Sequence, residues 1–355
     1  MNYFIVSENC KDTGVEKKID AQAEALTNLG SYVKLFCLTD RILYRLFIFP
    51  ITILFKVKKC DTIYYRYSAL NFGIHVFLLI FFRYRYTIEI NTMNTYELHI
   101  MSKINSSSRL KKYLNLLFEK QLYRYSSRIL TFTHEIQEYI TMIYPCEKVI
   151  VIDNGYEIEH VDLAQDTAVA QLLDKKINEG YYIACVAGAF FPWLGLEKIC
   201  ELVSQMPSVF LVIMGNGDNN IQSLLENVHI TNRTCYLGKS DRAVLQTVYK
   251  SSDFAFATFN LSVKGMKEAR TLKMREYLYF GVPVIYNYIE SSAIENCPYV
   301  YNYMKNPSLE SMQKFIVSTR TIKKLNIYEF ARTQFDWKLI YKNSYFNDKF
   351  KRQRQ

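Results

Sequence analysis

The sequence of this protein predicts an α/β fold of two domains, each built around a parallel sheet. Its 355 residues exceed one ordinary domain and fit two of about 150 to 180 residues. Half of the residues are hydrophobic, which supplies two cores and argues against disorder. Short apolar runs alternate with helix-like segments, and strand, loop, helix and strand in that order form a parallel βαβ unit.

The first half of the chain opens with such a unit. A buried strand is expected at 3–6, an apolar helical stripe follows over 19–29 and stops at Gly30, and the next strand is expected at 32–38. The later elements expected in this half are strands at 61–67, 86–90, 128–134 and 148–157, a polar loop at 91–99 and a long helix at 109–125. One βαβ unit followed by further strands predicts one parallel sheet.

Two apolar runs in this half, at 46–55 and 74–82, have basic residues beside them. Each is too short to span a bilayer, which needs about 20 apolar residues. The first lies within 41–59 and is either a core helix bent at Pro50 or a helix lying in a membrane interface. Both readings remain open for both runs.

The second half repeats the alternation. A helical connector is expected at 162–178, and strands are expected at 181–190 and 209–214, the latter followed by a G-x-G turn. Strand, Gly238, helix and strand then occupy 234–258, and a terminal helix is expected at 335–350. This order predicts a second parallel sheet.

The stretch KGMKEARTLKMREYLYFGVPVIY, residues 264–286, contains the most informative motif. Glu268 and Glu276 are separated by seven residues, and a helix is expected after Arg270, with Gly281 as its left-handed stop. The VPVIY segment reads as a buried strand. The first amides of the helix, at Thr271, Leu272 and Lys273, suit a phosphate, and the side chains of Lys273 and Arg275 are close in sequence.

This arrangement resembles the E-x7-E signature of retaining glycosyltransferases with the GT-B fold, the family 4-like group. Its L-K-x-R-E-Y-x3-G-x-P-V form is similar to enzymes of bacterial capsule, exopolysaccharide and lipopolysaccharide synthesis. The resemblance implies two Rossmann-like doubly wound domains facing a cleft: an acceptor domain at 1–160, a nucleotide-sugar domain at 175–335 and a crossover helix at 336–350. It also implies that Glu276 holds the ribose, Glu268 contacts the transferred sugar, and the helix amides hold the diphosphate.

Further positions carry the same resemblance. On the donor side it implies roles for Gly188, Ala189, Gly215, Asn216 and Gly238, and on the acceptor side for Gly14, Thr92 and Asn94. The chain departs from the family where an arginine and a lysine usually contact the diphosphate. Ala189 and Leu194 stand there instead, which removes two charge-assisted contacts. Lys273 and Arg275 are therefore expected to carry more of that task.

Charge and cysteine content indicate which partners the protein could bind and in which compartment it acts. The net charge is +10, and residues 1–150 hold 20 basic against 13 acidic residues. The excess suits a lipid phosphate, an anionic membrane or simply a solvated surface. The eight cysteines show no C-x2-C spacing, which indicates neither zinc nor a redox pair and favours a reducing cytoplasm. The run at 3–6 is too short for a signal peptide.

The sequence therefore predicts a cytoplasmic glycosyltransferase that takes a nucleotide-sugar donor and a glycan or lipid-linked acceptor. No Asp-x-Asp motif is present, so no metal is expected, and docking on the cytoplasmic face of the inner membrane is a further expectation. Three rivals stay open: a GT-B sugar-nucleotide epimerase, a non-catalytic glycosyltransferase-like binding protein, and a nucleic-acid-binding protein. The last is disfavoured because no reading motif is present and the basic charge is spread out.

Overall fold

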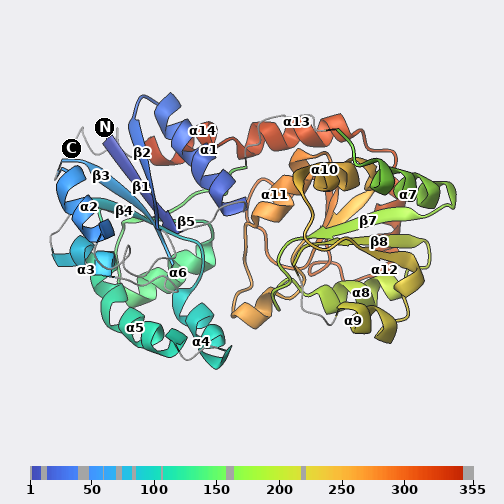
Figure 1. The fold of residues 1–355 in the computed structure, drawn as a ribbon, viewed down its shortest axis with the longest axis horizontal. Coiled ribbons are helices and arrows are strands. Elements are labelled where there is room, and N and C mark those ends of the chain that lie inside the picture. The colour runs from blue at the N-terminus through green and yellow to red at the C-terminus, as the bar shows by residue number, and fades with distance from the viewer. Residues whose placement is uncertain are drawn as a thin grey trace. The chain divides into compact units, whose positions relative to one another are not determined.

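A computed structural model of the protein describes residues 2–8, 14–38, 48–58, 60–68, 74–81, 85–104, 107–156, 164–216 and 221–346. The chain divides into two compact units, coloured mainly blue to green and green to red in Figure 1. Unit 1 comprises Met1–Ile158 together with Asp336–Gln355, and unit 2 comprises Glu159–Phe335. Each unit has its own six-stranded parallel sheet.

The sheet of unit 1 has the strand order β2-β1-β3-β4-β5-β6. Its strands are β1 (Asn2–Glu8), β2 (Tyr32–Leu38), β3 (Thr62–Tyr67), β4 (Tyr86–Ile90), β5 (Arg128–Thr131) and β6 (Val149–Val151). Its helices are α1 (Gly14–Asn28), α2 (Phe49–Lys56), α3 (Ile74–Phe81), α4 (Asn94–Ile104), α5 (Ser107–Tyr125) and α6 (His134–Ile143). Strand β2 lies on one side of β1, and β3 to β6 lie on the other. The direction of winding therefore reverses at β1, and the sheet is doubly wound.

The C-terminal segment closes the core of unit 1. Helix α13 (Lys324–Phe335) ends unit 2, and Asp336 then caps the short helix α14 (Trp337–Ile340) by accepting hydrogen bonds from two backbone N–H groups. A π-helix, Tyr341–Phe346, follows. Trp337 is fully buried, and its ring lies so close to Gly155 that a Cβ there would come within 2.6 Å. The single terminal helix expected at 335–350 is thus several elements, and residues 347–350 lie outside the described ranges.

A buried ionic network joins this segment to the sheet. The Glu89 carboxylate on β4 accepts hydrogen bonds from Lys18 Nζ at 2.9 Å, Gln22 Nε2 at 2.7 Å and Tyr64 Oη at 2.6 Å. The Tyr341 hydroxyl donates to Tyr64 Oη at 3.3 Å. Burial alone would raise the pKa of Glu89, but the Lys18 and Arg66 charges and these hydrogen bonds lower it to about 2. The carboxylate therefore stays ionised inside unit 1.

Two segments of unit 1 differ from their expected structure. Pro50 lies in the first turn of α2 rather than at a bend, a position where its fixed φ fits and its missing N–H leaves no bond unmade. Residues 41–47 and 59 of that run, and residue 82 of the second run, lie outside the described ranges. The polar loop expected at 91–99 is only three residues long, because α4 begins at Asn94.

The sheet of unit 2 has the strand order β12-β11-β10-β7-β8-β9. Its strands are β7 (Tyr182–Ala187), β8 (Val209–Met214), β9 (Thr234–Tyr236), β10 (Phe254–Phe256), β11 (Val284–Tyr286) and β12 (Val300–Asn302). Its longer helices are α7 (Thr167–Asn178), α8 (Leu196–Ser204), α9 (Ile221–Asn227), α10 (Arg242–Ser251), α11 (Leu272–Tyr279), α12 (Leu309–Thr319) and α13. The winding reverses between β7 and β10, so this sheet is doubly wound as well.

Candidate functional site

The candidate site lies at the carboxyl edge of the unit 2 sheet. In a parallel sheet all strands end at the same edge, and ligands bind there at the point where the winding reverses. That point lies between β7 and β10. Helix α11 follows β10 and precedes β11, so it runs against the strands and its first turn lies at this edge. The topology therefore brings the turn after β7 and the start of α11 together.

Three glycine turns, separated widely in sequence, meet at this edge. Gly188 follows β7, Gly215 follows β8 and Gly238 follows β9. The Gly215 N–H donates to the Gly238 carbonyl at 2.7 Å, and Gly188 N–H donates to the Met214 carbonyl at 2.9 Å. A Cβ on Gly215 would lie 1.7 Å from the Gly188 oxygen, and its φ is +143°. Glycine is required at 215 because the two turns touch through their backbones.

The start of α11 is built as the sequence predicts. Thr271 is the N-cap, and its hydroxyl accepts from the Met274 N–H. The Thr271 hydroxyl also lies 3.0 Å from that of buried Tyr288. Gly281 ends the helix with a φ of +72°, and β11 follows at Val284. The N-terminal amides carry the partial positive charge of a helix end and can hold an anion.

Lys273 and Glu276, on the first turns of α11, form a polar cluster with Tyr249 of α10. Lys273 Nζ donates to Glu276 Oε2 at 2.7 Å, and the Tyr249 hydroxyl donates to Glu276 Oε1 at 3.2 Å. The Lys273 side chain also approaches Gly188, whose Cβ position would be 4.0 Å from Lys273 Cε. Each carboxylate oxygen has a second lone pair, so Glu276 keeps acceptor capacity for a ligand hydroxyl. The cluster thus offers a cation toward the glycine turn and an oriented carboxylate.

Glu268 precedes the start of α11 and is held by the segment that follows β11. Its backbone forms a parallel bridge with Ile289, and the Ile289 N–H donates to the Lys267 carbonyl at 2.8 Å. Its side chain, which is buried, accepts a hydrogen bond from Ser291 Oγ. The segment after β11 thereby positions Glu268. No local signal in the sequence indicates this relation, because Ser291 lies 23 residues further along the chain.

The structure corrects the role expected of the Arg275 side chain. Arg275 is fully buried and pairs with Glu290 through Nη1 and Oε2 at 3.0 Å, with the Phe335 ring 5.1 Å from its guanidinium carbon. Glu290 is also buried. The guanidinium therefore does not face a donor. It anchors the segment that carries Ser291, so its contribution to the site is positioning.

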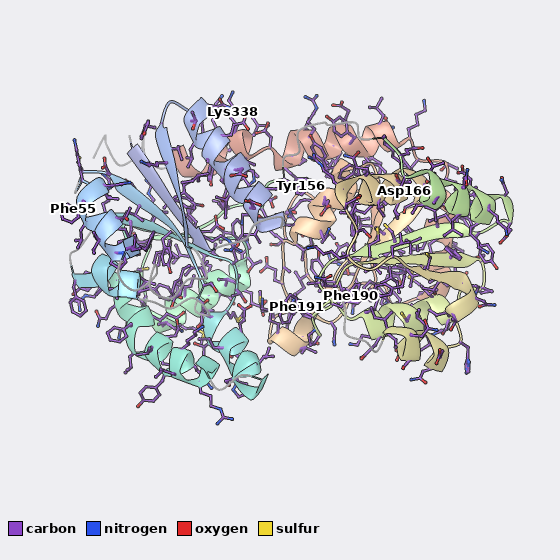
Figure 2. The ribbon with its side chains drawn as sticks, in the orientation of Figure 1. Phe55, Tyr156, Asp166, Phe190, Phe191 and Lys338 are labelled. Carbon is purple, nitrogen blue, oxygen red and sulfur yellow. The ribbon has the colours of Figure 1, made fainter. Side chains whose placement is uncertain are left out.

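The turn in which the usual basic pair is absent is aromatic. Ala189 is exposed, whereas Leu194 is buried in the unit 2 core, where a lysine would be unfavourable. Phe191 and Trp193 stack with ring centroids 4.6 Å apart, and Lys264 Nζ lies 4.7 Å from the Trp193 centroid. Figure 2 labels Phe190 and Phe191 on this turn. Nearby, the carbonyl of Asn216 accepts from the Phe190 N–H at 3.2 Å, which ties the two turns together.

The acceptor-side residues expected in unit 1 lie at the carboxyl edge of its sheet, but Asn94 is buried. Gly14 is the first residue of α1, and Thr92 and Asn94 follow β4. Asn94 is buried, with its amide nitrogen 3.5 Å from Glu119 Oε1. Burial raises the pKa of Glu119, although several hydrogen bonds oppose that effect. Asn94 therefore supports the packing of α4 on α5 rather than presenting its amide to solvent.

No group of three or more His, Cys, Asp or Glu side chains within the described ranges is arranged to hold a metal ion. No helix in the part of the chain that the structure describes is long and apolar enough to cross a membrane.

Residues 171–299 match the family Glycosyl transferases group 1. This range includes all the donor-side residues described above. No curated protein matches the sequence. The family match thus concerns unit 2 and not the whole chain.

Solved structures match the whole chain. Sucrose-phosphate synthase from Thermosynechococcus elongatus is 14% identical with a TM-score of 0.70, covering 99% of this chain and 98% of that one. HepE from Anabaena, in complex with UDP-glucose, is 14% identical with a TM-score of 0.68 over 97% and 98%. An E. coli trehalose-6-phosphate structure bound with UDP-2-fluoro glucose is 12% identical with a TM-score of 0.66 over 97% and 98%. Together with the two doubly wound sheets, these similarities confirm the GT-B fold.

Proposed function

We propose that the protein transfers a sugar from a nucleotide diphosphate donor to a hydroxyl acceptor. The observation that supports this most is the meeting of Gly188, Lys273 and Glu276 at the switch point of a parallel sheet. All three lie within the range that matches the group 1 glycosyltransferases. The nucleotide-sugars named in the structures of HepE and the E. coli protein support the same donor class.

In the proposed reaction the bond from the sugar carbon to the diphosphate oxygen breaks, and a bond from that carbon to the acceptor oxygen forms. The proton of the acceptor hydroxyl passes to the departing nucleotide diphosphate. The departing diphosphate gains negative charge, which the α11 amides and Lys273 Nζ would stabilise. The sugar carbon gains positive charge, and the Glu268 carboxylate would lie near it and orient the sugar hydroxyls. Glu276 would accept hydrogen bonds from the ribose hydroxyls. These are the roles expected from the sequence, except that the Arg275 side chain does not help Lys273 to stabilise the diphosphate.

We also propose the finer points that the family resemblance implies. Transfer retains the anomeric configuration, and the acceptor is a lipid-linked or growing surface-polysaccharide glycan. The protein acts in the cytoplasm, at the inner face of the membrane.

Acceptor-dependent nucleotide release tests the proposed reaction. Purified protein would be incubated with a panel of UDP- and GDP-sugars, with and without a bacterial membrane extract, and the released nucleotide measured. Release that requires the extract supports transfer. Conversion of the donor without any extract would indicate an epimerase instead, and binding without turnover would indicate a non-catalytic protein.

Glu276→Ala should weaken the binding of UDP about 10- to 100-fold, because a hydrogen bond to a charged group contributes roughly 1.5–3 kcal/mol. The ribose assignment is checked by calorimetry with UDP and 2′,3′-dideoxy-UDP. The parent protein should prefer UDP, whereas the variant should bind both nucleotides equally. A variant that keeps the full preference for UDP would show that Glu276 does not hold the ribose. Glu276→Ala also frees Lys273 from its ion pair, which changes the affinity for both nucleotides alike. The ratio of the two affinities is therefore unaffected by that change.

The transfer rate should be unchanged by EDTA, because the α11 amides and Lys273 are proposed to stabilise the leaving group. The measurement is the rate of nucleotide release before and after chelation, followed by addition of Mg²⁺ or Mn²⁺. Loss of activity in EDTA with recovery on adding either ion would contradict the proposal.

A further inference from the structure

Three neighbouring helices of unit 1 carry apolar side chains on their outer surface. Helix α2 packs against α3, and α3 packs against α5, so the three form one continuous layer on the sheet (Figure 1). A helix on a water-soluble surface normally turns its polar side outward. Here the reverse arrangement recurs on α2 and α5, and the outer surface of the three helices is called the α2–α3–α5 face below.

Helix α5 shows the arrangement most fully. Leu110, Tyr113, Leu117, Lys120 and Arg124 recur every three or four positions, so they lie along one side of the helix. All five are exposed, and Leu117 is 56% exposed. The buried residues of α5 occupy the opposite side. The outward stripe is thus apolar at its first half and basic at its second.

Helices α2 and α3 extend this stripe. Ile51, Leu54 and Phe55 are exposed on α2, and the Phe55 ring, labelled in Figure 2, is 85% exposed. Phe81 at the end of α3 is 69% exposed. The apolar runs found in the sequence therefore put part of their side chains on the surface rather than in the core. Such large exposed apolar groups on adjacent elements mark an interaction surface.

Within the described ranges of the three helices, the charge that is not buried has one sign. The basic residues of 48–58, 74–81 and 107–125 are Lys56, Lys58, Arg109, Lys111, Lys112, Lys120 and Arg124, of which Arg109 and Lys112 reach Ser102 and His99 on α4. The acidic residue in the same ranges is Glu119, and it is buried. The described part of the face therefore combines apolar side chains with positive charge, as helices that lie in a membrane interface do. A second copy of the same face would bring like charges together, which disfavours self-association.

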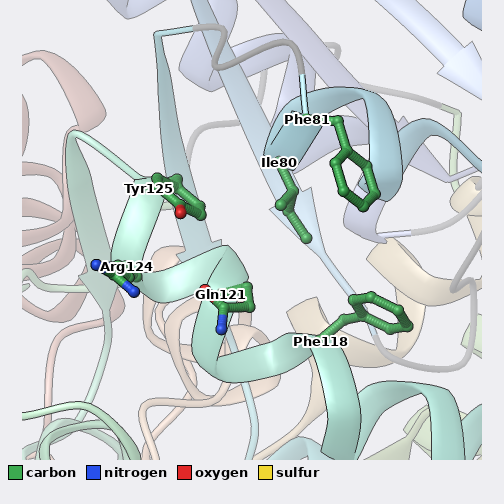
Figure 3. A pocket seen from close by; sticks show the side chains of 6 residues that line it. All are labelled: Ile80, Phe81, Phe118, Gln121, Arg124 and Tyr125. Atoms are coloured by element: carbon green, nitrogen blue, oxygen red, sulfur yellow. The ribbon is translucent and has the colours of Figure 1, made fainter.

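A pocket of about 330 Å³ lies between α3 and α5 on this face (Figure 3). Its lining consists of Ile80, Phe81, Phe118, Gln121, Arg124 and Tyr125. Figure 3 shows the rings of Phe81 and Phe118 on one side and the guanidinium of Arg124 away from them on the other. Among the described lining residues, an apolar wall adjoins one cation, Arg124, which matches the parts of a phospholipid, whose acyl chains adjoin an anionic phosphate.

We propose that the α2–α3–α5 face binds an anionic lipid bilayer, with its exposed aliphatic and aromatic side chains in the headgroup region. Its basic side chains contact lipid phosphates, and one lipid occupies the pocket with its phosphate at Arg124. Binding is peripheral and reversible, since each basic residue contributes only about 1 kcal/mol near such a surface. This assignment rests on the membrane location proposed above and names the surface responsible for it, but it does not depend on sugar transfer, because lipid binding can be measured without donor or acceptor.

Vesicle co-sedimentation tests the proposal. The full chain should pellet with phosphatidylcholine vesicles that contain phosphatidylglycerol, and stay in the supernatant with phosphatidylcholine alone. Raising the salt to about 1 M shortens the Debye length to about 3 Å and should release most of the protein. Protein that stays in the supernatant with anionic vesicles at low salt, or pellets equally with both kinds, overturns the proposal.

Paired variants locate the surface. Phe55→Ser with Leu117→Ser, and separately Lys120→Glu with Arg124→Glu, should each lower partitioning into anionic vesicles at least about tenfold. The matched controls lie in unit 2: Leu325→Ser for the apolar pair, and Lys175→Glu with Lys323→Glu for the charge pair, all exposed. Controls that lose as much binding as the test pairs would overturn the assignment.

Two further measurements separate binding from folding and from self-association. All variants should keep the thermal unfolding midpoint of the parent, because the exchanged side chains are exposed. Light scattering should show the same mass for the parent and for both test pairs. A dimer in the parent that the test pairs abolish would assign the face to a second copy and overturn the lipid proposal.

Discussion

Lys273→Met should lower the turnover of sugar transfer about 10²- to 10³-fold, the usual effect of removing one donor that stabilises a developing anion. Lys273 extends toward Gly188 from the first turn of α11, and the basic pair common in similar enzymes is replaced by Ala189 and Leu194. Methionine keeps the length and apolar stem of lysine but removes its charge. Steady-state kinetics with a fixed donor and acceptor measure the effect on kcat.

The control for this change is Lys175→Met, an exposed lysine on α7. It should leave kcat and KM unchanged. Both variants should unfold at the temperature of the parent, since the Lys273 side chain is one-third exposed. If Lys273→Met turns over within threefold of the parent, the diphosphate is stabilised by the backbone amides alone and the proposed role of Lys273 is wrong.

Arg275→Met should lower the free energy of unfolding of unit 2 by about 3–5 kcal/mol, because it leaves the carboxylate of Glu290 buried without its nearest cation. Arg275 and Glu290 are both buried. A second arginine, Arg270, also approaches Glu290, with its Nε 3.9 Å from Glu290 Oε1. Urea denaturation followed by circular dichroism measures the loss. This arginine therefore contributes much more to stability than an exposed one.

Two further variants isolate the ion pair. Arg275→Met with Glu290→Leu should regain at least half of the lost stability, because apolar side chains can replace a buried pair at little cost. Arg332→Met, which removes an exposed arginine paired with Glu329, should leave the unfolding midpoint unchanged. Equal destabilisation by Arg275→Met and Arg332→Met would show that the buried ion pair contributes no more to the free energy of unfolding than an exposed one.

The elements that the sequence predicted correctly are those whose signals are local. Strand β2 occupies 32–38 and β4 occupies 86–90 as expected, and Gly281 follows the C-cap of α11 in the left-handed conformation. Apolar runs, caps and stop residues act within a few positions of the chain, so one segment carries enough information. The loop expected at 91–99 was wrong because α4 begins at Asn94, where polar side chains serve buried contacts instead of solvent.

The residues proposed for the site could be picked out from the sequence, but the residues that hold them in place could not. Glu276 and the first turn of α11 could be read from one motif of the sequence. Tyr249, which donates to Glu276, and Ser291, which donates to Glu268, carry no local signal because their partners lie 27 and 23 residues away. Arg275 looked like a phosphate ligand until its burial against Glu290 was known.

By itself, then, the sequence determined the α/β class, the order of the elements and the motif at 264–286. These depend on hydrophobic period and backbone preference, which are properties of short segments. Only the tertiary structure decided which glycine turns meet, which charges are buried and which apolar side chains face outward. Those depend on the packing of segments far apart in the chain, and the same leucine in a helix can belong to a core or, like Leu117, to the surface.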